Sequence, residues 1–287
     1  MGRLYESLQR AERERRQPGA SGDEIAHTPE LLGGLIPEPF ELESVLSATI
    51  EIRSKSHLVA LADPKCLAAE KFRALVTRLE HLRNERELKS LLITSSIVNE
   101  GKTFVAGNLA VTLAKHFGSR VLLIEGDLHR PALASLLGLT RLQGLSHWWS
   151  TRKDNIAHYV YKINGMPLWF FGAGESCDQP SQILQSAEFA EAFSRLRGSF
   201  DWILVDSPPM LPTADVNLWS RLVDGTLLVV REGVAPVKAL EQGLASLDKP
   251  KLVGIVLNET SEVDQRKYAG QYYGSPKSGK QILNEKH

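Results

Sequence analysis

The residues best suited to chemistry lie in one short segment, 95–103, which reads Ser-Ser-Ile-Val-Asn-Glu-Gly-Lys-Thr. An apolar run typical of a strand, 91–94, precedes this segment. Apolar residues at helical spacing follow it, namely Val105, Leu109, Leu113 and Phe117. A strand, a tight loop and a helix N-terminus form an anion site, because the free backbone N–H groups and the helix dipole both point at the anion. The segment therefore predicts a phosphate-binding loop.

Two side chains at the end of this loop indicate which phosphate ligand it takes. Lys102 would contact the β- and γ-phosphates of a nucleotide, and the Thr103 hydroxyl would ligate Mg²⁺. The usual pattern is Gly-x-x-x-x-Gly-Lys-Ser/Thr, and Ser96 stands here at the position of the first glycine. We therefore predict that ATP and Mg²⁺ bind, and that the nucleotide is surrounded by Ser96, Val98, Asn99, Glu100, Gly101, Lys102, Thr103 and Phe104.

Three carboxylates follow two further apolar runs. Asp206 ends one run, and Glu125 and Asp127 follow another. The carboxyl ends of parallel strands line the ligand site of an α/β sheet, so Asp206 is expected to hold Mg²⁺ directly or through water. Glu125 or Asp127 would orient or deprotonate an attacking hydroxyl, or help to hold the metal. Asp127 alone could instead be an N-cap near Pro131, but three neighbouring acids repel one another unless a cation lies between them.

The elements that must position these residues follow the order of an α/β fold. Short, continuously apolar runs are typical of strands buried on both faces of a parallel sheet, and they lie at 91–94, 121–124, 168–171, 202–205, 226–230 and 252–257. Amphipathic segments predict helices at 65–83, 103–117, 131–137, 186–197, 213–222 and 236–246. The predicted fold is a mostly parallel central sheet with helices on both faces.

By composition the chain divides into four parts. We predict a short amphipathic helix at 1–16, a flexible Pro- and Gly-rich linker at 17–39, the α/β domain at 40–258 and a flexible tyrosine-containing tail at 259–287. Lys plus Arg and Asp plus Glu number 34 each, so the chain has no basic field for nucleic acid. No run reaches the ~20 apolar residues of a membrane-spanning helix. We therefore expect a cytoplasmic protein whose contact with a membrane would need another protein.

Three motifs follow one another along the chain, namely Gly101-Lys102-Thr103, Glu125-x-Asp127-x-x-Arg130-Pro131 and Val205-Asp206-Ser207-Pro208-Pro209. Residues 224–231, residues 254–258 and the pair Glu70 and Arg73 complete the pattern. In this order the motifs resemble the bacterial tyrosine kinases (BY-kinases) of capsule and exopolysaccharide assembly, in their stand-alone form. These kinases are P-loop NTPases, and the resemblance covers roughly residues 57–287.

The resemblance implies roles for individual residues. Catalytic roles fall on Lys102, Asp127, Glu125 and Asp206. The implied ligands of Mg²⁺ are Thr103, Asp206 and Asp127. Asn258 sits where related folds contact adenine. The implied phosphate acceptors are Tyr268, Tyr272 and Tyr273.

The resemblance also implies a cellular role. It implies an ATP-dependent tyrosine autokinase that regulates exopolysaccharide or capsule polymerisation and export. Neighbouring subunits would be the substrates, within a ring-shaped homo-oligomer. A membrane-anchored activator of the chain-length-regulator type would bring the protein to the inner face of the plasma membrane.

Two other functions compete with an active kinase. A nucleotide-gated adaptor of the polysaccharide assembly complex, with weak or no kinase activity, is favoured by two departures from the family pattern. Glu125 stands where the family has Asp, and Val76 stands where the oligomerisation motif Glu-x-x-Arg-x-x-Arg has its last Arg. The second alternative is a partition-type ATPase, which carries an additional lysine five residues before the main one. Ile97 occupies that position here, which argues against this alternative.

Overall fold

The computed structural model describes residues 45–50, 58–140, 142–151, 155–211 and 214–260. The predicted N-terminal helix and linker, and the tail tyrosines Tyr268, Tyr272 and Tyr273, lie outside the described residues. Within the described ranges, no helix is both long and apolar enough to cross a lipid bilayer.

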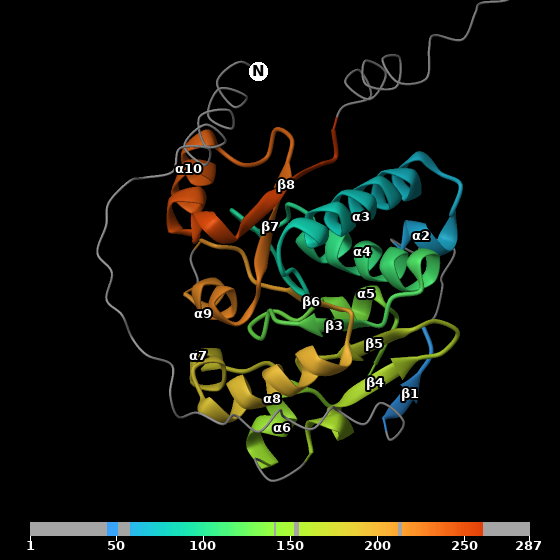
Figure 1. Ribbon diagram of the computed structural model, residues 1–287. Coiled ribbons are helices and arrows are strands. Elements are labelled where there is room, and N and C mark those ends of the chain that lie inside the picture. The colour runs from blue at the N-terminus through green and yellow to red at the C-terminus, as the bar shows by residue number, and fades with distance from the viewer. Residues whose placement is uncertain (1–44, 51–57, 141, 152–154, 212–213, 261–287) are drawn as a thin grey trace, which may run out of the picture.

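One eight-stranded sheet forms the centre of the molecule (Figure 1). Its strands are β1 (Leu46–Ala48), β2 (Ser90–Ser95), β3 (Val121–Glu125), β4 (Val160–Ile163), β5 (Leu168–Phe171), β6 (Trp202–Asp206), β7 (Gly225–Arg231) and β8 (Leu252–Asn258). They lie in the order β1-β4-β5-β3-β6-β2-β7-β8. The strands from β5 to β8 in that order run parallel, and only the pair β4 and β5 is antiparallel among the described pairs. The predicted mostly parallel sheet is therefore confirmed, and every predicted strand is present.

Two strands, β1 and β4, were not predicted. β1 has three residues, and it pairs Leu46 with Tyr161 of β4. β4 has four residues, of which Lys162 is exposed, and it pairs Val160 with Phe171 of β5. Runs this short, interrupted by a polar residue, carry too little periodicity to be distinguished from a loop. Both strands extend the sheet on the side away from β7 and β8.

The α-helices are α2 (Val59–Ala62), α3 (Leu67–Glu85), α4 (Lys102–Phe117), α5 (Leu133–Leu136), α6 (Leu145–Thr151), α7 (Pro180–Leu184), α8 (Ala187–Ser199), α9 (Asp215–Leu222) and α10 (Val237–Ser246). Two short 3₁₀ helices, η1 (Ile156–Tyr159) and η2 (Lys249–Lys251), complete the list for the described chain. The helix predicted at 131–137 shortens to a single turn. Its start is set by the Glu125 carboxylate, which accepts hydrogen bonds from the N–H groups of Leu133 and Ala134. The short helices α2, α6 and α7 were not predicted.

Two layers of helices cover the two faces of the sheet (Figure 1). Leu91 and Ile93 of β2 pack on one face with side chains from α2, α3, α4 and α5. Leu92, between them, packs on the other face with side chains from α6, α7, α8, α9 and α10. Successive side chains of a strand point to opposite faces. Because both faces are buried, the strands are continuously apolar rather than alternating.

The register of the parallel strands decides which residues meet at the carboxyl edge of the sheet. Asp206 of β6 is paired with Ile93 of β2 on one side and with Glu125 of β3 on the other. The phosphate loop leaves β2 after Ser95, and α4 begins at Lys102. The loop and the acidic residues therefore share one edge of the sheet.

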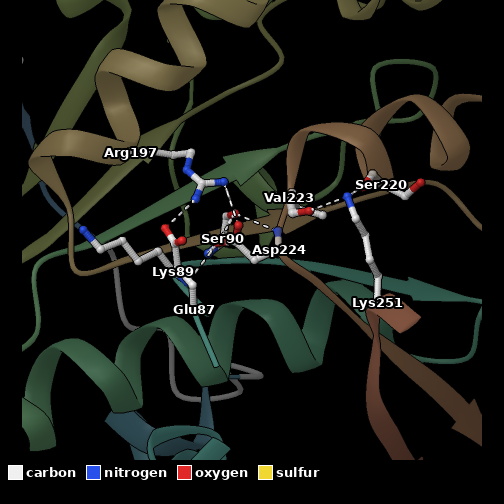
Figure 2. A network of polar contacts seen from close by, with 8 residues as sticks. All are labelled: Glu87, Lys89, Ser90, Arg197, Ser220, Val223, Asp224 and Lys251. Atoms are coloured by element: carbon white, nitrogen blue, oxygen red, sulfur yellow. Dashed lines mark hydrogen bonds and ion pairs between the residues drawn. The ribbon is translucent and has the colours of Figure 1, made fainter. Parts of the chain in front are cut away.

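At the opposite edge, a network of polar contacts ties the start of β2 to the start of β7 and to α8 (Figure 2). The Asp224 carboxylate accepts hydrogen bonds from the N–H groups of Lys89 (2.9 Å) and Ser90 (2.8 Å) and from the Ser90 hydroxyl (2.8 Å). It also forms an ion pair with Arg197 (2.8 Å), whose guanidinium lies 3.3 Å from the Glu87 carboxylate. Burial by itself raises the pKa of Asp224, but the donors from Lys89 and Ser90 and the charge of Arg197 together lower it.

Lys251 belongs to the same edge and fixes the C-terminal end of α9 (Figure 2). Its ammonium donates hydrogen bonds to the carbonyl oxygens of Ser220 (2.6 Å) and Val223 (2.9 Å). The last carbonyls of a helix have no intrahelical partner, and a cation there also stabilises the helix dipole. These contacts stabilise this edge of the sheet, since Asp224, Arg197 and Lys251 each have partners there.

We predict that Asp224→Ala lowers the free energy of unfolding by about 2–3 kcal/mol, because two backbone N–H groups and Arg197 lose their acceptor. Urea denaturation followed by circular dichroism measures the change. Asp248→Ala is the matched control, because Asp248 is exposed and its loss should change stability by no more than about 0.5 kcal/mol. Equal effects of the two substitutions would contradict the prediction.

Candidate nucleotide-binding site

The phosphate loop turns from β2 into α4 through two residues with left-handed backbone. The φ angle is 65° at Asn99 and 92° at Gly101. Asparagine is among the few residue types that tolerate such an angle. Glycine suits position 101 because a φ of 92° strains any residue with a Cβ, and a Cβ there would also lie 2.1 Å from the side-chain nitrogen of Asn258, which would have to move. The turn therefore brings the start of α4, with its free N–H groups, to the loop.

The other predicted loop residues differ in where their side chains lie. Ser96 is fully buried, and its hydroxyl lies beside α10, where a Cβ built on Gly243 would come within 3.2 Å of it. Val98 is exposed. Phe104 packs on Phe72, with 5.8 Å between the ring centroids. Serine at the usual first-glycine position is accommodated because Gly243 leaves room for it.

Lys102 and Asp127 lie together at the site. The Lys102 Nζ atom is 3.4 Å from Oδ2 of Asp127, and both side chains are mostly buried. The Oδ1 atom of Asp127 accepts a hydrogen bond from the N–H group of Arg130 at 3.0 Å. The N-cap of α5 is Ala132, so the alternative role of Asp127 as an N-cap is wrong. Asp127 instead closes a turn and faces the phosphate loop.

Asp206 lies at the end of β6 and is only 1% exposed. The Thr103 hydroxyl donates a hydrogen bond to its carboxylate, whereas Oδ1 has no hydrogen-bond partner among the described residues. The pKa of Asp206 is raised to about 7, chiefly by burial and to a smaller extent by the charges of Glu125 and Asp127, although the Lys102 ammonium and the Thr103 hydroxyl lower it. A buried carboxylate with one unpaired oxygen is costly unless a cation binds it.

Glu125 is buried, and both of its carboxylate oxygens are occupied. Oε1 accepts hydrogen bonds from the N–H groups of Leu133 (2.6 Å) and Ala134 (3.1 Å), and Oε2 accepts one from Ala173 (3.1 Å). Burial raises the pKa of Glu125, the three backbone N–H groups oppose this, and the charge of Asp127 adds to it. Glu125 thus supports the start of α5 and the segment after β5. Its role in orienting a hydroxyl stays a prediction.

Two residues of α9 hold the segment after β3, and neither was predicted. Asp215 Oδ2 lies 3.0 Å from Nε2 of His129. The indole nitrogen of Trp219 donates a hydrogen bond to the carbonyl oxygen of Gly126 at 3.1 Å. Asp215 and Trp219 are four residues apart, so both lie on one face of the helix. An acid and a tryptophan four residues apart on one face of a short helix were the sequence signal from which these two contacts could have been predicted.

Few protein groups at this site could hold a metal ion. Nowhere in the described ranges do three or more His, Cys, Asp or Glu side chains group so as to hold one. Thr103 and Asp206 are in hydrogen-bond contact, whereas Asp127 is engaged with Lys102. Mg²⁺ keeps several waters and binds one or two carboxylates together with phosphate oxygens, so this sparse donor set fits it.

A phosphate loop between a central parallel strand and a helix, with Lys102, Thr103 and Asp206 around it, defines a P-loop NTPase.

The family model described as cellulose biosynthesis protein BcsQ matches residues 89–261. The tyrosine-protein kinase YwqD of Bacillus subtilis (strain 168) is 29% identical over 225 residues, which cover 78% of this chain and 93% of YwqD. CapB of Staphylococcus aureus is 31% identical over 214 residues, which cover 74% of this chain and 92% of CapB.

Solved structures of a tyrosine kinase domain and of a P-loop ATPase are similar to this chain. The kinase domain of the Escherichia coli tyrosine kinase ETK superposes with a TM-score of 0.63 at 26% identity, covering 75% of this chain and 92% of that domain. MinD of Pyrococcus horikoshii, complexed with Mg-ADP, has a TM-score of 0.51 at 21% identity, covering 66% of this chain and 79% of MinD, which shows the fold alone. The chain belongs to the matched family and, with YwqD and CapB, to the bacterial tyrosine kinases.

We predict that Asp206→Asn stabilises the protein at pH 8, without divalent cations, by roughly 2–4 kcal/mol. The pKa of Asp206 rises from 3.8 to about 7 on folding, so unfolding releases a proton between these values. The native carboxylate therefore lowers stability progressively as the pH rises from about 4 to about 7, and asparagine does not.

Urea unfolding in the presence of a chelator, at several pH values, measures the difference between Asp206→Asn and the wild type. The difference should grow with pH and become constant above about pH 7. Asp248→Ala serves again as the control, and its effect should not depend on pH in this range. A pH-independent difference for Asp206→Asn would show that Asp206 is not the titrating group.

Proposed function

We propose that this protein binds ATP with Mg²⁺ and transfers the γ-phosphate to tyrosines of its own subunits. The observation that carries the proposal is the grouping of Lys102, Thr103, Asp127 and Asp206 at the carboxyl edge of the sheet. Phosphoryl transfer depends almost entirely on positioning and on electrostatic stabilisation. Lys102 supplies the positive charge for the phosphate oxygens, and the N–H groups at the start of α4 add to it.

Thr103 and Asp206 are the residues that would hold Mg²⁺, with phosphate oxygens and water as its other ligands. The unpaired Oδ1 atom of Asp206 supports this assignment. A bound Mg²⁺ supplies positive charge that neutralises the β- and γ-phosphate oxygens. Asp127 is a weaker candidate as a ligand, because its oxygens already contact Lys102 and the N–H group of Arg130.

Asp127 is the better of the two candidate acids for orienting the tyrosine hydroxyl. When Lys102 contacts the phosphates, Oδ2 of Asp127 is released to accept a hydrogen bond from that hydroxyl. Glu125 has no such freedom, because three backbone N–H groups occupy its oxygens. Asp127 therefore takes the catalytic role, and Glu125 positions the backbone around it.

The names of the relatives also suggest a cellular role, which we include in the proposal. The protein regulates exopolysaccharide or capsule polymerisation and export from the cytoplasm, at the inner face of the membrane, through a membrane-anchored activator. Support comes from the names of the relatives, which are tyrosine-protein kinases, and from the family description, which names cellulose biosynthesis. The proposed acceptors Tyr268, Tyr272 and Tyr273 belong to a C-terminal segment outside the described residues.

A nucleotide-gated adaptor is the second candidate, and α3 favours it. Val76 is fully buried in the core, so it cannot replace the arginine of the oligomerisation motif at a surface. Arg73 forms an ion pair with Glu70 of the same helix (2.8 Å) and donates a hydrogen bond to the carbonyl oxygen of Pro64 (2.9 Å). The residues that would join neighbouring subunits in a ring are therefore partly engaged within one subunit.

We predict that Lys102→Ala weakens ATP·Mg²⁺ binding by roughly a hundredfold or more, because the charged donor to the phosphates is lost. Isothermal titration calorimetry measures the affinity. Lys115→Ala is the matched control, since Lys115 is exposed in the last turn of the same helix. An affinity of Lys102→Ala equal to that of the control would refute the site.

We predict that incubation with ATP·Mg²⁺ phosphorylates Tyr268, Tyr272 or Tyr273 in the wild type but not in Lys102→Ala. Asp127→Asn should retain most of the ATP affinity and lose phosphorylation, because asparagine cannot accept the hydroxyl proton. Mass spectrometry of the C-terminal tail, with and without an activator fragment, reads out both results. Tight ATP binding together with an unmodified tail under both conditions would favour the adaptor.

A further inference from the structure

Glu100 lies inside the phosphate loop, yet its side chain is turned away from solvent. It is fully buried. Its Oε2 atom accepts a hydrogen bond from the N–H group of Ile97 at 2.9 Å, and Oε1 accepts one from the N–H group of Arg231, at the end of β7, at 3.3 Å. One carboxylate therefore joins the loop to a strand 131 residues later in the chain.

Asn258, the last residue of β8, holds the same point of the loop from the other side. Its side-chain amide donates a hydrogen bond to the carbonyl oxygen of Glu100 at 3.0 Å. It approaches the loop so closely that a Cβ at position 101 would lie 2.1 Å from its side-chain nitrogen and would displace it. The Arg231 guanidinium adds a longer hydrogen bond, 3.4 Å, to the carbonyl oxygen of Asn99. We call Glu100, Arg231 and Asn258 the loop clamp.

The loop needs such a clamp for two reasons. Asn99 has a backbone conformation that is uncommon for residues other than glycine, and such conformations persist only where the surroundings hold them. In addition, a carboxylate that pointed into an anion site would repel the phosphates. Turning Glu100 inward lessens this repulsion and uses its charge to hold the N–H groups of Ile97 and Arg231.

We infer that Glu100 and Asn258 are positioning residues, which hold the phosphate loop in its binding shape from the ends of β7 and β8 without contacting the nucleotide. For Asn258 this replaces the predicted contact with adenine. The inference rests on the proposed binding of ATP for its functional consequence, although the clamp itself is a property of the loop. It makes nucleotide affinity depend on the ends of β7 and β8, and the C-terminal segment follows the end of β8.

The test compares Glu100→Ala, Glu100→Gln and Asn258→Ala in the full-length protein, with Glu241→Gln, an exposed residue of α10, as the matched control. Calorimetry measures the affinity of each variant for two probes, ATP·Mg²⁺ and inorganic triphosphate with Mg²⁺. Glu100→Ala should weaken both by about ten- to a hundredfold, since hydrogen bonds to a charged group are lost. Glu100→Gln keeps one acceptor oxygen and should lose less.

Three outcomes would overturn the inference. If Glu100 only repels phosphate, both of its variants bind the probes more tightly than the wild type. If Asn258 contacts adenine, Asn258→Ala weakens the affinity for ATP and leaves that for triphosphate unchanged, whereas a clamp residue weakens both equally. If all three variants bind like Glu241→Gln, the clamp does not position the loop.

Hydrogen exchange of the nucleotide-free protein separates this inference from the proposed function. Peptides that cover 95–103 and 229–234 should exchange faster in Glu100→Ala and in Asn258→Ala than in the control, with the rest of the sheet unchanged. Unchanged protection in those peptides would refute the clamp even if ATP binds. A wild type that binds neither probe would refute the proposed function, and the exchange result would still decide the clamp.

Discussion

The parallel register of β2, β6 and β3 is the constraint on which the site depends, because it places Asp206 between the end of β2 and the acidic segment after β3. A slip of one residue would turn Asp206 to the other face of the sheet and away from Thr103. Since these strands are apolar on both faces, hydrophobic pattern alone does not select the register.

Polar contacts at the amino edge of the sheet favour the observed register of the strands. Asp224 binds the backbone at Ser90 and so aligns β7 with β2. Arg120 and Asp201 align β3 with β6 in the same way: the Arg120 N–H group donates to the Asp201 carboxylate at 2.8 Å, and the Asp201 N–H group donates to the Arg120 carbonyl at 2.9 Å. The two edges of the sheet therefore have different functions. The amino edge has paired charges that fix the register, whereas the carboxyl edge leaves Asp206 Oδ1 and Ser96 Oγ without partners among the described atoms.

The sequence predicted the parallel strands and long helices well, because their apolar runs are continuous and their helical stripes are regular. Lys102, Thr103, Asp127 and Asp206 were also predictable, since strand ends place residues whatever the side-chain detail. The contacts that Glu100, Glu125 and Asn258 make with backbone groups were not predictable. Each depends on hydrogen bonds to backbone groups that are distant in the chain or set by a turn, and backbone donors carry no sequence signature.

The two departures from the family pattern, Glu125 and Val76, have different consequences in the structure. An aspartate at position 125 would be one methylene shorter, and it could not keep the contacts with Leu133, Ala134 and Ala173 that Glu125 makes. The glutamate therefore holds the backbone at the start of α5 and after β5, and in the proposed function Asp127 remains the acid that orients the hydroxyl. Val76 has no such compensation, because it is buried in the core. Under the proposed function, the two departures therefore act on different properties: Glu125 bears on the backbone beside Asp127, and Val76 bears on how subunits would meet.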